Sequence, residues 1–178
     1  MPRPPDVERR AQLVSALVEA YGEDGLGSRS LRDLAERLGT SHRMLIHHFG
    51  SREGMLVAVV QAVEQRQAEV LDRLDGPPAD VLERLWATLS DPVLRPFERL
   101  FFECYARGAS GERPFDRLLP GIVDSWLDAG TALAPGLDPA LARLSLAVVR
   151  GLLLDLVATG DEQATTQALV RFADLLRG

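Results

Sequence analysis

The segment between Ser30 and Gly50 constrains the fold most, because its pattern predicts two short helices joined by a glycine-containing turn. Ser30 precedes Asp33 by three residues, and this Ser-x-x-Asp spacing can cap the first turn of a helix. Gly39 stands where a left-handed residue ends a helix at the least cost, and Ser41 can cap the next helix. Two short helices that meet at such a turn are typical of the helix-turn-helix motif.

Both short helices carry apolar residues on one face only, at the spacing that a helix requires. These apolar residues are Leu31, Leu34, Ala35 and Leu38 in the first helix and Leu45 and Phe49 in the second. A long helix is expected to follow over residues 53–74, where Val and Leu recur at helical spacing. An ordinary helical hairpin of a bundle has the same turn and the same apolar face, so periodicity leaves both alternatives open.

The distribution of charge favours a nucleic-acid-binding motif over a plain hairpin. The net charge is −6, which by itself argues against a polyanionic partner. Residues 1–52, however, hold eight Arg against seven acids, a net charge of +1, whereas residues 53–178 hold twelve Arg against nineteen acids, a net charge of −7. All three His lie in the basic segment, and no acid occurs from Ser41 to Arg52. A basic N-terminal segment on an otherwise acidic chain is expected to bind DNA.

Several classes of protein are disfavoured by what the sequence lacks. Cys104 is the only cysteine, so an internal disulfide framework is excluded, and no Cys/His spacing suits a metal. There is no nucleophile–base set and no phosphate-binding glycine loop, so we expect neither an enzyme nor a cofactor. The N-terminus has no apolar signal core, and the longest apolar run is too short to cross a membrane. We therefore expect a cytoplasmic protein without membrane contact.

The stretch SLRDLAERLGTSHRMLIHHFGSREGML resembles the DNA-binding segment of the TetR family of bacterial regulators, over about residues 8–75. The most specific positions are Leu34, Ala35, Gly39, Ser41, Leu45, Phe49, Ser51, Arg52, Glu53 and Leu56. The resemblance implies an all-α fold. Residues 1–52 would form a three-helix DNA-binding domain, and residues 75–178 would form a helical effector-binding and dimerisation domain. The helix of residues 53–74 would connect the two domains.

The resemblance also implies which side chains meet DNA, and Arg43 is the strongest candidate for contacting guanine in the major groove. The full predicted set is Ser30, Arg32, Ser41, His42, Arg43, Met44, Ile46, His47, His48 and Arg52. Arg32 and His42 would also approach base edges, and most of the others would lie along phosphates. For His48, packing beside Phe49 is an equal alternative. Two positions depart from the family: Ile46 replaces a usual aromatic residue, and Arg52 replaces a usual Lys.

The remaining chain predicts helices over residues 79–89, 93–108, 115–133, 139–159 and 162–176. The helix of residues 93–108 is the richest in aromatic residues, which favours a small-molecule site there, with ordinary core packing as the alternative. The predicted ligand-binding residues are Trp86, Phe97, Phe101, Glu103, Cys104, Tyr105, Asp124 and Trp126.

The helix of residues 139–159 is apolar on nearly every side, so a partner subunit is expected to cover part of it, together with the last helix. The predicted dimer interface comprises Leu146, Val149, Leu152, Leu153, Leu156, Leu169, Phe172 and Leu176. Arg150 and Asp155 interrupt the apolar surface. We expect them to form ion pairs at the edge of the interface, with an acidic effector for Arg150 as the alternative.

Residues and resemblance together predict a homodimeric, one-component transcriptional regulator. It is expected to act as a repressor that binds palindromic operator DNA and is released by a small-molecule effector. The alternative is a DNA-binding dimer that has no small-molecule effector.

Overall fold

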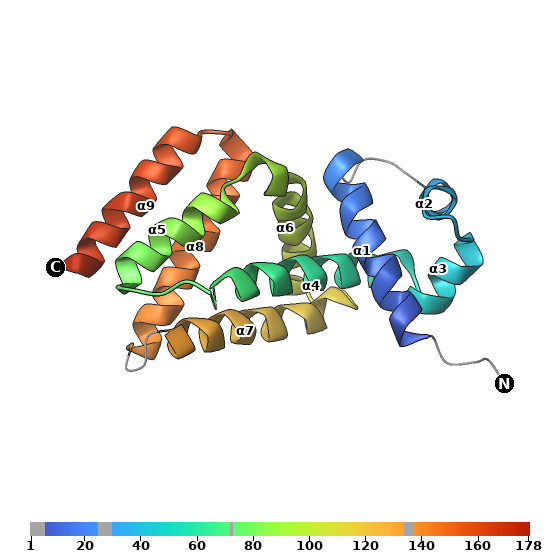
Figure 1. The fold of residues 1–178 in the computed structure, drawn as a ribbon, viewed down its shortest axis with the longest axis horizontal. Helices are drawn as coiled ribbons and strands as arrows, with labels where there is room; N and C mark the ends of the chain where they lie inside the picture. The colour runs from blue at the N-terminus through green and yellow to red at the C-terminus, as the bar shows by residue number, and fades with distance from the viewer. Residues whose placement is uncertain (1–5, 25–29, 72, 134–136) are drawn as a thin grey trace.

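The structure, a computed structural model, describes residues 6–24, 30–71, 73–133 and 137–178. Every regular element in these ranges is a helix, which confirms the predicted all-α fold (Figure 1). In chain order the helices are α1 (Val7–Asp24), α2 (Leu31–Arg37), α3 (His42–Phe49), α4 (Arg52–Leu71), α5 (Pro78–Leu89), η1 (Pro92–Leu94), α6 (Arg95–Ala109), η2 (Phe115–Arg117), α7 (Leu118–Leu133), α8 (Pro139–Thr159) and α9 (Glu162–Arg177).

The turn between α2 and α3 forms as the sequence predicts. The Ser30 hydroxyl accepts a hydrogen bond from the Asp33 amide at 3.2 Å, and the Ser30 amide donates to the Asp33 carboxylate at 3.1 Å. This capping box satisfies amides that the first turn of α2 leaves free. Gly39 follows α2 with a φ of +60°, and the Ser41 hydroxyl accepts from the Met44 amide to begin α3.

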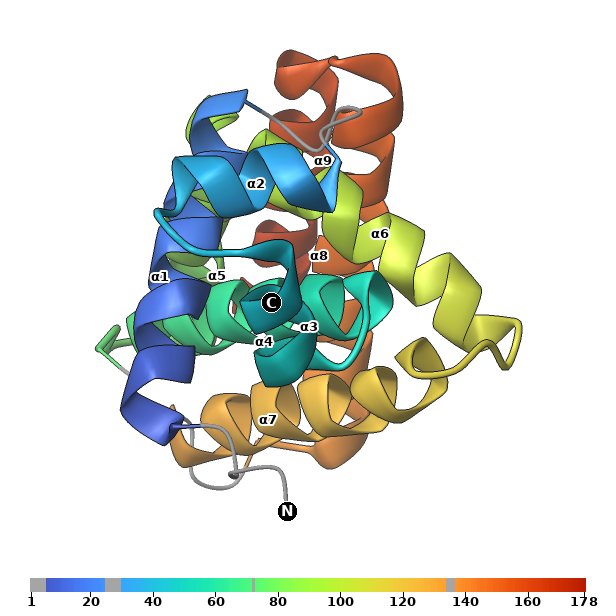
Figure 2. The ribbon, with the colours of Figure 1, turned by 90° about the vertical axis from the view of Figure 1, so that its right-hand side faces the viewer.

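Helices α1, α2 and α3 form one end of the molecule, and α4 runs from that end into the bundle of α5 to α9 (Figure 1). Figure 2 looks onto this end and shows α3 in front of α4, with α2 above it. Helix α3 approaches α4 very closely, since a Cβ built on Gly54 would lie 2.1 Å from the Phe49 carbonyl oxygen. The position of α3 is therefore set by α4.

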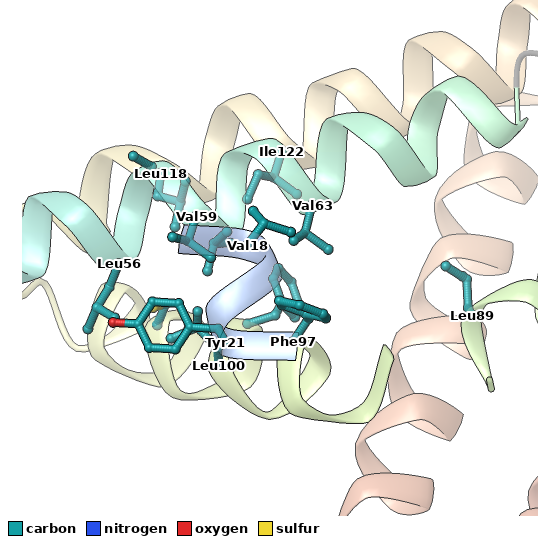
Figure 3. Close-up of a cluster of buried hydrophobic side chains, with 14 of the residues drawn as sticks. Val18, Tyr21, Leu56, Val59, Val63, Leu89, Phe97, Leu100, Leu118 and Ile122 are labelled. Atoms are coloured by element: carbon teal, nitrogen blue, oxygen red, sulfur yellow. The ribbon is translucent and has the colours of Figure 1, made fainter. Parts of the chain in front are cut away.

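One buried apolar cluster joins this end to the bundle (Figure 3). Val18 and Tyr21 of α1 lie beside Val59 of α4 and beside Phe97 and Leu100 of α6, and all are at most 7% exposed. Leu118 and Ile122 of α7 complete the cluster on the far side of α4. The end that carries α3 thus shares a core with the bundle.

The predicted helix ranges agree with the structure to within a few residues, with two local differences. The predicted helices 93–108 and 115–133 each begin with a 3-10 turn, η1 and η2, before the α-helix starts. The predicted connecting helix 53–74 corresponds to α4, which ends at Leu71. No helix of the described ranges is long and apolar enough to cross a membrane. The division into domains of 1–52 and 75–178 stays a prediction.

Candidate nucleic-acid interface and buried cavity

Helix α3 packs by one face and leaves the other open to solvent. Leu45 and Phe49 are 1% and 8% exposed and anchor the helix on the core. The opposite side carries Arg43 and His47, which are both exposed, and His42 is exposed at the start of the helix. We call the outward side chains of α3 and its surroundings the α3 surface; it comprises Ser30, Arg32, Ser41, His42, Arg43, Met44, His47 and Arg52, all exposed.

The electrostatics of the α3 surface suit a polyanion. Helix α3 has no acidic residue in its first turn, where the aligned peptide dipoles leave a partial positive charge. Arg32 from α2 and Arg52 from the start of α4 add formal positive charge from both sides. Phosphate oxygens are the ligands that such a surface binds best.

His48 does not belong to the α3 surface, which corrects one expectation. Its ring is only 7% exposed and lies beside that of Phe49, with 6.5 Å between the ring centroids. Neither ring nitrogen has a hydrogen-bond partner among the described residues. Burial, and then the neighbouring His47, lowers the pKa of His48 and favours the neutral ring. The packing alternative therefore describes His48. Ile46 is half-buried.

A cavity of about 160 Å³, partly open to solvent, lies in the bundle and is lined by residues of α4, α5, α6, α7, α8 and α9. A cavity of roughly this volume accommodates one benzene ring in other proteins. Its lining is mostly apolar and includes the rings of Phe101, Phe102 and Trp126. The polar lining residues are Glu64, Gln67, Glu98, Ser145 and Arg150.

The polar residues of the cavity are partly paired with one another. Trp126 donates its indole N–H to Glu64 Oε2 at 2.8 Å, and Gln67 Nε2 donates to Glu98 Oε1 at 2.9 Å. Arg150 lies over the Phe101 ring, 5.4 Å from its centroid, and its Nη2 atom has no hydrogen-bond partner within the described residues. We call Glu64, Glu98 and Arg150 the cavity charge cluster.

Burial shifts the protonation of the cavity charge cluster. It raises the pKa of Glu98 to about 7, and the negative charge of Glu64 adds to this effect. Burial also raises the pKa of Glu64, although the hydrogen bond from Trp126 opposes it. Burial lowers the pKa of Arg150, against the attraction of Glu64. Glu98 is therefore a group of the cavity that changes charge near neutral pH.

The cavity only partly coincides with the predicted ligand-binding residues. Phe101 and Trp126 line it, as expected. The other six predicted residues lie elsewhere: Trp86, Phe97 and Cys104 are buried away from its wall, and Glu103, Tyr105 and Asp124 are exposed. Trp86, for example, uses its indole N–H to donate to Thr166 at 2.9 Å. Aromatic content located the right helix but not the side of it that faces the cavity.

Sequence reasoning missed the polar residues of the cavity, although a signal for them exists. Val60, Glu64, Gln67 and Leu71 follow one another at spacings of four, three and four, and all are buried. This spacing places a carboxylate and an amide on the same inward face of α4 as apolar side chains. Polar residues in the apolar register of a helix mark a buried polar site.

The predicted dimer interface also needs correction, because half of it is interior to one protomer. Val149, Leu153, Leu156 and Leu169 are at most 5% exposed and are covered by other helices of the same chain. Leu146, Leu152, Phe172 and Leu176 are half-buried. The large apolar side chains that remain exposed on α8 and α9 are Leu144, Leu154, Val170 and Leu175. Arg150 lines the cavity, Asp155 is exposed, and the ion pairs expected for them at the edge of an interface stay a prediction.

Comparison with known proteins agrees with this architecture. Residues 13–59 match the family model of the bacterial regulatory proteins of the tetR family. The chain is 35% identical over 156 residues to the HTH-type transcriptional regulatory protein RaaS of Mycobacterium tuberculosis, covering 84% of this chain and 71% of that protein. It is 28% identical over 176 residues to the HTH-type transcriptional regulator BetI of Pseudomonas aeruginosa, covering 90% of this chain and 87% of that protein.

Solved structures share the fold. A transcriptional regulator from Rhodococcus sp. Rha1 superposes with a TM-score of 0.75 at 21% identity, covering 94% of this chain and 95% of that one. The multidrug binding protein EbrR, complexed with imidazole, superposes with a TM-score of 0.64 at 25% identity, and the match covers 96% of this chain and 93% of that one.

The exposed α3 surface on an all-helical bundle defines a helix-turn-helix transcriptional regulator. The chain belongs to the TetR family of bacterial regulatory proteins. Its relatives regulate transcription and are not enzymes.

The protonation of Glu98 predicts how the substitution Glu98→Gln changes stability with pH. The unfolded chain ionises Glu98 near the ordinary value of 4.5, whereas the folded chain holds its proton up to about pH 7. The wild type therefore loses stability as pH rises from 4.5 to 7, and the variant escapes this loss because Gln does not titrate. In urea titrations, the stability of Glu98→Gln relative to wild type should rise over this range by about 3 kcal/mol.

The control is Glu69→Gln, which removes an exposed carboxylate from α4. Its stability relative to wild type should stay flat over the same pH range. A flat response of Glu98→Gln as well would contradict a buried, neutral Glu98.

Proposed function

We propose that the chain is a homodimeric repressor that binds palindromic operator DNA through the α3 surface and leaves the DNA when a small molecule fills the cavity. The observation that carries the proposal is α3 itself, a short helix anchored by Leu45 and Phe49 with an acid-free, exposed opposite face. A helix of this kind fits the major groove of DNA. Bacterial operators lie in the cytoplasm, so the proposal also locates the protein there.

In this proposal the base contacts come from Arg32, His42 and Arg43, and Arg43 contacts guanine. The phosphate contacts come from Ser30, Ser41, Met44, His47 and Arg52, which position the helix without specifying sequence. Ile46 is half-buried at the edge of the α3 surface, where its side chain could meet a thymine methyl group.

Two helices connect the cavity with the α3 surface. Helix α4 carries Glu64 and Gln67 to the cavity and Leu56 and Val59 to the cluster that it shares with α1. Helix α6 carries Glu98 to the cavity, and its neighbour Phe97 packs near α1 (Figure 3). A ligand that shifts α4 or α6 would move α1 and α3 with it, since packed helices move as bodies. This contact path supports release of DNA by a ligand.

The largely apolar cavity also supports a small-molecule effector. EbrR, which shares the fold, is described as a multidrug binding protein, and structures of it contain imidazole and proflavin. We extend to this chain only the expectation that a small organic molecule binds inside the bundle.

The partner in the dimer would be a second copy of this chain, because a palindromic operator requires a protein with two-fold symmetry. Leu144 and Leu154 of α8 are 52% and 50% exposed, and Leu175 of α9 is 66% exposed. Exposed leucines along two neighbouring helices are the surface that a four-helix interface would cover.

The substitution Arg43→Ala tests the base contact. It should weaken binding to the cognate operator by about 10- to 100-fold, because a bidentate contact to guanine contributes about 1–3 kcal/mol of discrimination. Binding to random DNA should fall only slightly. Fluorescence anisotropy at one fixed salt concentration measures both affinities. Arg66→Ala removes an exposed charge from α4 and serves as the control. Equal losses on operator and random DNA would rule out base contact by Arg43.

The substitution Leu154→Asp tests the interface. A carboxylate at the centre of an apolar contact would have to be buried without a partner, so the variant should sediment as a monomer. Val93→Asp changes another exposed apolar side chain, on η1 outside α8 and α9, and should remain dimeric. Dimers of Leu154→Asp would show that the interface lies elsewhere.

A further inference from the structure

We propose that the cavity selects a hydrophobic monocation of about one aromatic ring, such as an aryl ammonium compound, with the Glu98 carboxylate as its counter-ion. The inference rests on the proposed function, because it assigns a chemical class to the effector of the same cavity. The charge, the hydrogen bonds and the size of the cavity all support a cation.

The charges of the cavity do not balance. Glu64 from α4, Glu98 from α6 and Arg150 from α8 are the titratable side chains among its described lining residues, and α5 and α7 contribute none. Two carboxylates and one guanidinium carry a net charge of −1 when all are ionised. The carboxylates are buried, at 8% and 4% exposure, so solvent screens this charge less than it would at the surface. A ligand with one positive charge would make the site neutral.

The hydrogen bonds leave room for a cation at Glu98. An ionised carboxylate can accept about four hydrogen bonds, and the described residues give Glu98 one side-chain donor, Gln67 at 2.9 Å. Glu64 is held more firmly, since it accepts from Trp126 at 2.8 Å and attracts Arg150. In the empty cavity Glu98 avoids an uncompensated charge by keeping its proton, in line with its pKa of about 7.

The size and lining of the cavity favour a small aromatic cation. About 160 Å³ accommodates roughly one ring with its substituents. Phe101, Phe102 and Trp126 present rings to the cavity, and aromatic faces attract cations. Phe101 already has the Arg150 guanidinium over its ring at 5.4 Å. A methylated ammonium group suits such a site because it needs charge compensation but few hydrogen-bond acceptors.

An anion on the unpartnered Nη2 atom of Arg150 is the competing occupant. Such an anion would join Glu64 and Glu98 in the same low-dielectric space and would add to the negative charge that Glu98 protonation relieves. The electrostatics of the cavity therefore favour the cation.

Binding of the cation should depend on pH, because it requires ionised Glu98. Glu64 and Arg150 face Glu98 across the cavity, and Tyr105 lies near Arg150. With a pKa of about 7, the ionised fraction of Glu98 rises about tenfold from pH 6 to pH 8. The affinity for the cation should rise by about the same factor, and binding below pH 7 should release a proton.

Three compounds of matched size test the proposal by calorimetry on the full-length protein. Phenyltrimethylammonium is the cation, tert-butylbenzene is its neutral isostere, and benzenesulfonate is an anion of similar shape. At pH 8 the cation should bind at least tenfold more tightly than the isostere, and the anion should bind most weakly. Tighter binding of the isostere or of the anion would overturn the proposal.

The substitution Glu98→Gln removes the carboxylate charge and keeps the size of the side chain, so it shows how much of the binding depends on that charge. The variant should bind the cation and the isostere equally and should lose the pH dependence, while Glu69→Gln on exposed α4 surface should behave as wild type. A cation preference that survives in Glu98→Gln would overturn the role of Glu98.

A second measurement distinguishes this inference from the proposed function. Anisotropy of the operator complex shows whether the cation releases the DNA. Cation binding that depends on Glu98 but leaves the operator bound supports the inference and contradicts the proposed release. Release by another compound, with no cation binding, supports the proposed function and overturns the inference.

Discussion

Burial of α4 is the constraint on which both candidate sites depend. Its first half packs against α1 and α3, its second half forms a wall of the cavity, and Val59 between them is fully buried. Each large apolar side chain buried in this way contributes roughly 1.5–3 kcal/mol to folding. Because one helix contributes to both ends, the proposed release of DNA would follow if a ligand in the cavity shifted α4 and α3 with it.

The interior holds polar groups that folding alone does not require. Glu64 and Glu98 would be more stable in water, and apolar residues of similar size would pack the bundle at lower cost. The exposed leucines of α8 and α9 are the reverse case, because they are apolar side chains in contact with water. In a single, unliganded protomer the two buried carboxylates exceed the one guanidinium among the described residues of the cavity lining, and the exposed leucines lack an apolar cover. A ligand in the cavity and a second copy on α8 and α9 would satisfy them.

Local signals predicted the parts of the fold that local chemistry determines. The caps at Ser30 and Ser41 and the turn at Gly39 lie within a few residues of what they stabilise, so the two short helices were predictable. The cavity was not, because helices far apart in sequence form its walls and aromatic content does not show which side chains face it. Periodicity also overstated the interface, since it cannot tell whether an apolar side chain such as Leu169 meets its own chain or a partner. His48 shows the same limit, because its type suits phosphate as well as packing.

The central claim is that two copies of the chain present their α3 helices to successive major grooves of one DNA molecule. Hydroxyl-radical footprinting tests it most directly, on a fragment selected by the protein from the genome that encodes it. The account predicts two protected patches on one face of the DNA, separated by one helical turn of about 34 Å or a multiple of it. A single short patch, or uniform protection without a repeat, would contradict it.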